Sequence, residues 1–246
     1  MAEKLRSLLR SPRSVLPLKA AAFGLTLYWN YVNGGGWLRA SILVLVTAAL
    51  YFKPLFNAVT FLRSMAVLLT LAVLAGGYIP AAYDWAAALF FAALFYVIMG
   101  LKEFIFIARA RVHLAVFTML SYLTLFAYFT SDRRENFLEY TALAGLSFFF
   151  IMSELLGAET NLPVRHGLAV SGAFTMIFSQ ALWILGILPV GFLAATALGV
   201  IFAFTLGDAA AAYYTKNTNS RRLVGRAALF AVLAVLILLA SKWTAR

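Results

Sequence analysis

The 246-residue chain contains no cysteine. Its absence excludes disulfides, thiolate metal sites and a cysteine nucleophile. Histidine is almost as scarce: the chain has only two, His113 and His166, too few for a three-histidine zinc site. We therefore expect neither a metal nor another cofactor.

Charge is also scarce. Only 12% of the residues are Asp, Glu, Lys or Arg, against about a quarter in soluble domains, and 64% are hydrophobic. No water-soluble fold could cover so much apolar surface, so lipid must cover much of it. The apolar runs, such as 233–240, are unbroken, whereas the strands of a transmembrane β-barrel alternate apolar and polar residues. The composition predicts an all-α polytopic transmembrane helical bundle.

Helix breakers and charged residues divide the chain into about nine apolar segments. A basic cytosolic tail at 1–14 precedes a single transmembrane domain at 15–243, and a short tail at 244–246 follows it. Because Lys19 and Asn30 lie inside the first segment, eight spans are the alternative. The predicted spans are 15–32, 38–52, 64–80, 84–101, 112–130, 137–156, 167–187, 190–212 and 225–242.

Basic residues favour nine spans with a cytosolic N-terminus, because cytoplasmic loops carry an excess of Lys and Arg. Nine spans put 15 basic residues inside and 5 outside, whereas eight spans give 10 on each side. The inner residues are Lys4, Arg6, Arg10, Arg13, Lys19, Lys53, Arg63, Lys102, Arg109, Arg111, Arg165, Lys216, Arg221, Arg222 and Arg226. The outer residues are Arg39, Arg133, Arg134, Lys242 and Arg246.

The same sorting explains the net charge of +11. The basic inner loops are expected to contact the anionic headgroups of membrane lipids, so no nucleic-acid partner is needed. The expected location is the plasma (inner) membrane of a bacterium or archaeon.

Four ionisable residues near span ends are the main candidates for a site: Glu103, Arg109, Glu154 and Asp208. Ionisable residues in or near spans commonly mark functional sites in membrane proteins. The nine-span arrangement brings all four to the inner face, which predicts a cytosol-facing polar pocket. Alternatively, each is a helix-end charge that reaches water or pairs with a neighbour.

A polar stripe on the seventh predicted span is a second candidate site. Ser171, Thr175 and Ser179 recur every four residues, and Gln180 lies beside them. These side chains could line a water path or bind a polar substrate group. Alternatively, the hydroxyls bond to their own helix or to a neighbouring helix.

The eighth predicted span carries small residues at the same spacing: Ala195, Gly199, Ala203 and Gly207. Small residues let another helix approach closely, so this stripe predicts helix packing. It would place Asp208 beside a helix contact.

No catalytic pair accompanies these residues. The run Val170–Phe174 resembles the serine motif of rhomboid proteases, but the histidine that this family needs after the serine is missing. Three hypotheses follow. The chain binds or transports a lipid-like or small amphiphilic molecule; it is a lipid-modifying membrane enzyme, an interpretation that a bound Mg²⁺ between Glu154 and Asp208 would favour; or it is a non-catalytic subunit or scaffold with membrane-protein partners.

Overall fold

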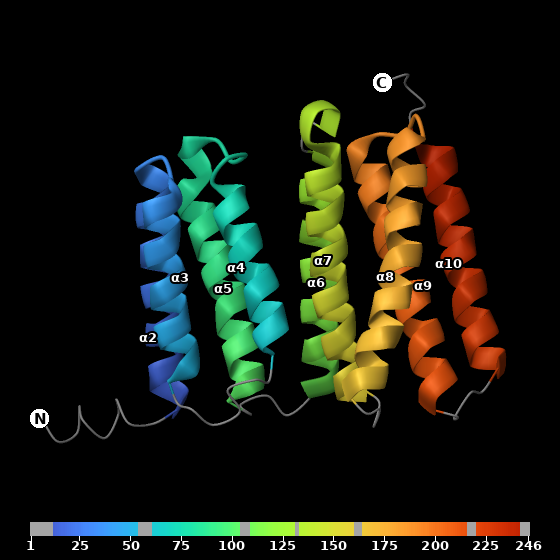
Figure 1. Ribbon diagram of the computed structural model, residues 1–246, viewed down its shortest axis with the longest axis horizontal. Coiled ribbons are helices and arrows are strands. Elements are labelled where there is room, and N and C mark those ends of the chain that lie inside the picture. Colours follow the sequence, from blue (N-terminus) through green and yellow to red (C-terminus); the bar gives the residue numbers. More distant parts are fainter. Residues whose placement is uncertain are drawn as a thin grey trace, which may run out of the picture. The chain divides into compact units, whose positions relative to one another are not determined.

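The computed structural model describes residues 12–53, 61–103, 109–130, 133–159, 164–215 and 220–241. Within these ranges the chain forms nine α-helices, a short 3-10 helix and no strand, which confirms the all-helical prediction (Figure 1). Each predicted span overlaps one α-helix. The elements are α2 (Pro12–Val32), α3 (Trp37–Phe52), α4 (Leu62–Ala75), η1 (Ala81–Tyr83), α5 (Asp84–Lys102), α6 (Arg109–Thr130), α7 (Arg133–Glu159), α8 (Val164–Ile187), α9 (Phe192–Thr215) and α10 (Ser220–Ala240).

Five helical stretches in the described ranges are long and apolar enough to cross a membrane. They are Ala81–Lys102, Val112–Thr130, Leu138–Gly157, Arg165–Ile187 and Phe192–Ala210. Three shorter apolar helices are Trp37–Phe52, Leu62–Ala75 and Val224–Ala240. These lengths and compositions are compatible with a helical membrane protein, because about 20 apolar residues cross the hydrocarbon core.

Contacts between residues divide the chain into two compact units, Met1–Val116 and Phe117–Arg246. The first unit holds α2 to α5 and the start of α6. The second holds the rest of α6 and α7 to α10. The single transmembrane domain expected over 15–243 stays a prediction.

In the first unit, α2 packs against α5 and α3, and α4 packs against α5. The rings of Phe23 and Phe95 stack with their centroids 4.6 Å apart. Gly24 allows the close approach of α2 and α5, because a Cβ atom there would lie 2.9 Å from the Cβ of Ala92. A missing side chain therefore sets the distance between these helices.

The loop between α2 and α3 is a turn that contains three glycines. Gly34, Gly35 and Gly36 have φ values of 74°, 67° and 105°, which residues with a side chain rarely adopt. Arg39 donates hydrogen bonds to the carbonyl oxygens of Asn33 and Gly35 and so ties the turn to the start of α3.

In the second unit, α8 packs against α7 and α9, α7 also contacts α9, and α10 packs against α9. Phe148 of α7 and Phe178 of α8 stack with their ring centroids 3.9 Å apart. Gly199 of α9 faces α6, since a Cβ atom at this position would lie 3.1 Å from the side chain of Leu125. Aromatic rings and small residues together form this core.

Candidate functional site

Glu103 lies in the first unit and forms an ion pair with Lys19. The Lys19 Nζ atom lies 2.8 Å from Glu103 Oε1, and the two side chains are only 9% and 10% exposed. Lys19 also donates a hydrogen bond to the carbonyl oxygen of Lys53, just after α3 ends. The polar residue that made the first predicted span doubtful therefore points into the protein.

Lys102, the last residue of α5, lies at the same end of α3. Its ammonium group donates a hydrogen bond to the carbonyl oxygen of Tyr51 and lies 4.0 Å from the centroid of the Tyr51 ring. Two lysines thus donate to carbonyl groups at the C-terminal end of α3, where the helix dipole favours positive charge. Here buried lysines hold three helices together.

Arg109 and Glu154 occupy different units. Arg109 is the first residue of α6, and its side chain lies outside the described residues. Glu154 lies on α7 and is partly exposed. The adjacent Leu155 has its Cδ2 atom 3.6 Å from where a Cβ of Gly207 would lie, so Glu154 is at the level of Asp208 on α9.

Asp208 forms an ion pair with Arg226 of α10. Arg226 Nη1 lies 3.3 Å from each carboxylate oxygen, and the side chains of Arg226 and Asp208 are 65% and 30% exposed. At 3.3 Å these hydrogen bonds are longer than the usual 2.7–2.9 Å or so for charged pairs. The pair is therefore open to a competing charged group.

The polar stripe on α8 faces α7 at one level. Ser171 Oγ donates to the carbonyl oxygen of Gly167, and Ser179 Oγ donates to that of Thr175, each within its own helix. A Cβ at Gly145 of α7 would lie 3.1 Å from Ser179 Oγ. Thr175 Oγ1 is buried without a hydrogen-bond partner among the described residues, and Gln180 is exposed.

The small-residue stripe on α9 faces inward, with Ala195, Gly199, Ala203 and Gly207 all buried. Gly199 packs beside Leu125 of α6, and Gly207 packs beside Leu155 of α7. Other residues of α9, such as Ile201 and Thr205, face α8 and α10.

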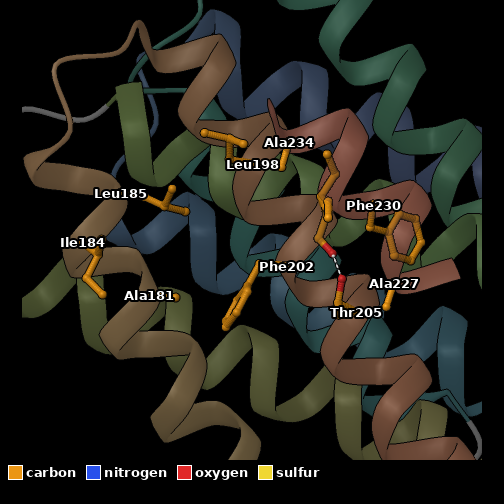
Figure 2. A pocket seen from close by; sticks show the side chains of 11 residues that line it. Ala181, Ile184, Leu185, Leu198, Phe202, Thr205, Ala227, Phe230 and Ala234 are labelled. Carbon is orange, nitrogen blue, oxygen red and sulfur yellow. Dashed lines mark hydrogen bonds between the residues drawn. The ribbon is translucent and has the colours of Figure 1, made fainter. Parts of the chain in front are cut away.

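An open groove of about 410 Å³ lies among α8, α9 and α10 (Figure 2). Its volume is within the ~300–1,000 Å³ typical of ligand pockets. Its polar side chain is Thr205, whose hydroxyl donates a hydrogen bond of 2.8 Å to the carbonyl oxygen of Ile201. The groove is lined by Ala181, Ile184, Leu185, Leu198, Ile201, Phe202, Thr205, Ala227, Phe230, Ala231 and Ala234.

Small side chains on α10 create this space. Ala227, Ala231 and Ala234 recur at helical spacing and form the α10 wall together with Phe230. This alanine face was the signal in the sequence from which the groove could have been predicted. The signal is weak because alanine is also common on helix faces that pack closely.

The ion pair lies just beyond one end of the groove. Asp208 follows the lining residue Thr205 by almost one helical turn, and Arg226 directly precedes the lining residue Ala227. From Leu198 to Thr205 the groove wall extends roughly 10 Å along α9, at ~1.5 Å per residue. The apolar groove thus leads to the ion pair of Asp208 and Arg226.

Two further sources of evidence on function are possible metal ligands and similarity to known proteins. Among the described residues, no group of three or more His, Asp or Glu side chains could hold a metal ion. Comparisons with family models, curated proteins and solved structures found no match.

Proposed function

We propose that this chain is a multi-pass integral membrane protein that binds or transports a lipid-like or small amphiphilic molecule. The hydrocarbon chain of that molecule would lie in the groove among α8, α9 and α10. Its polar headgroup would face Asp208 and Arg226. One observation carries the proposal: an apolar groove leads to an ion pair that is open to a competing charged group.

This proposal narrows the polar pocket expected from the sequence. Asp208 keeps its place beside the ligand, and Arg226 joins it. Glu103 has a buried partner in Lys19, which favours a structural role for that carboxylate. Arg109 and Glu154 belong to different units, and neither is among the residues that line the groove.

We also propose nine spans with a cytosolic N-terminus in the plasma membrane of a bacterium or archaeon. The contacts among Lys19, Lys53, Lys102 and Glu103 support this topology. They place the start of α2, the end of α3 and the end of α5 together, and nine spans assign all three ends to the inner side. Because the Lys19 ammonium is buried and paired with Glu103, its charge would not face lipid and so does not argue against α2 as a membrane span.

Selectivity in such a groove depends on fit. Lipid tails are as apolar as the groove, so moving a chain from the bilayer into the groove gains little hydrophobic free energy. Packing against the groove wall and contacts with the headgroup must provide the preference. A substitution that fills the groove should therefore remove binding without unfolding the protein.

The experiment compares Ala231→Phe, which fills the groove, with Ala228→Phe. Ala228 is also exposed on α10 but does not line the groove. Lipids that co-purify in mild detergent would be measured by native mass spectrometry. We expect the wild type and Ala228→Phe to retain a bound amphiphile and Ala231→Phe to lose at least ~90% of it, because the new ring occupies the space of the hydrocarbon chain. Equal retention by all three proteins would refute the groove as the binding site.

A second candidate, a subunit of a larger membrane complex, is favoured by the exposed faces of α8 and α10. Only 17% of the most apolar 18 residues within Arg165–Ile187 are buried within the chain. Either lipid or a partner helix could cover such a face. A partner that co-purifies in fixed stoichiometry would favour the subunit role, whereas turnover of a bound lipid would favour a membrane enzyme.

A further inference from the structure

We infer that the amphiphile bound in the groove carries an anionic headgroup, such as a phosphate or carboxylate, and that Arg226 selects it. This inference rests on the proposed function, because it assigns the headgroup of the molecule in that same groove. It adds a ligand class and a specificity-determining residue.

The first support is the unused hydrogen-bonding capacity of Arg226. A guanidinium group has five N–H donors, and here only Nη1 donates to Asp208. The other nitrogens have no partner among the described residues, and the side chain is 65% exposed. Planar guanidinium groups bind phosphate and carboxylate through two parallel hydrogen bonds, which this arrangement leaves possible.

The second support is the place of the pair at the ends of two apolar helical stretches. Arg226 lies two residues after the start of the stretch Val224–Ala240, and Asp208 lies two residues before the end of the stretch Phe192–Ala210. In the proposed membrane arrangement both side chains lie near the boundary between hydrocarbon and headgroups, which is where the headgroup of a molecule with its chain in the groove would also lie.

The third support is the sign of the charge in the sequence between the two residues. Between Asp208 and Arg226 the sequence holds three more basic residues, Lys216, Arg221 and Arg222, and no acidic residue. An anionic headgroup suits this basic segment better than a cationic one, and Asp208 then acts as a positioning residue that holds Arg226 beside the groove.

The test uses purified protein in mild detergent and four probes. Hexadecyl phosphate has a chain and an anionic head, monopalmitoylglycerol has a neutral head, and hexadecylphosphocholine has a zwitterionic head. Inorganic phosphate has no chain. Affinities would be measured by native mass spectrometry and by ligand-induced shifts of the melting temperature. Arg226→Gln is the test variant, and Arg165→Gln, which removes the same charge from an exposed position on α8, is the control.

For the wild type and Arg165→Gln, we expect hexadecyl phosphate to bind at least about 10-fold tighter than the neutral and zwitterionic probes. In Arg226→Gln, the affinity for hexadecyl phosphate should fall to within about 2-fold of that for the neutral probe, whose own affinity should not change. Inorganic phosphate should bind at least about 100-fold more weakly than hexadecyl phosphate, since it has no chain to place in the groove.

Three results would overturn the inference. They are equal affinities for the three chain-bearing probes in the wild type, a preference that persists in Arg226→Gln, and inorganic phosphate binding as tightly as hexadecyl phosphate. Failure of the proposed function looks different. In that case no chain-bearing probe binds, or Ala231→Phe leaves the binding of every probe unchanged.

Discussion

The buried ion pair between Lys19 and Glu103 gives the sharpest prediction about stability. Lys19→Met removes the ammonium and leaves the Glu103 carboxylate, only 10% exposed, without its partner. Removing one member of a buried pair typically costs about 3–5 kcal/mol, because the remaining charge stays uncompensated. The hydrogen bond from Lys19 to the carbonyl oxygen of Lys53 is lost as well.

The loss of stability should depend on whether one member of the pair remains charged without the other. In the double variant Lys19→Met/Glu103→Gln neither member of this pair is left as an unpaired charge, and replacing a buried pair by neutral residues is often close to neutral. We therefore expect each single variant to lower stability by about 3–5 kcal/mol and the double variant by less than about 2 kcal/mol. The two substitutions should be strongly non-additive.

The assay is thermal unfolding in mild detergent, followed by the fluorescence of the five tryptophans. A loss of 3–5 kcal/mol corresponds to a fall in Tm of about 6–20 °C for a chain of this size. Lys53→Met is the matched control, because the side chain of Lys53 is exposed and only its carbonyl oxygen contacts Lys19. Additive effects in the double variant, or single variants as stable as the control, would refute the reasoning.

The remaining predictions concern helix packing and topology. Gly24→Ala should lower stability by about 1–3 kcal/mol in the same melting assay, because the new Cβ would lie 2.9 Å from that of Ala92. Gly172→Ala is the control of opposite sign: nothing lies within 4 Å of its Cβ position, so the gain in helix propensity should stabilise α8 by up to about 1 kcal/mol. Equal effects at the two glycines would contradict the close approach of α2 and α5. Tags at the two ends of the chain should report opposite sides of the membrane, whereas tags on the same side would exclude nine spans.

The helices and their turns were determined by the sequence itself. Every hydrogen bond of an α-helix joins residues four apart, so local composition suffices to predict where helices form. The predicted span 112–130 lies within α6, and three glycines marked the turn at 34–36. The predicted span 64–80 was too long, because α4 ends at Ala75, just before Gly76 and Gly77.

The candidate site could be predicted only in part. Asp208 was identified from its place in an apolar helix, but its partner Arg226 was assigned only to the same membrane face. Glu103 was expected to line a ligand pocket, and its contact with Lys19, 84 residues away in the chain, was not predicted. The groove, too, was missed, because the alanines of α10 look the same in the sequence whether they enclose a space or pack closely.

Local hydrogen bonding and hydropathy thus suffice to predict from the sequence that this chain forms a set of apolar helices. Tertiary structure alone decided which charges pair and where the alanine face of α10 leaves an open groove. The physical reason is that a side chain contacts residues on other helices according to how those helices pack and rotate, and no local sequence pattern specifies that rotation.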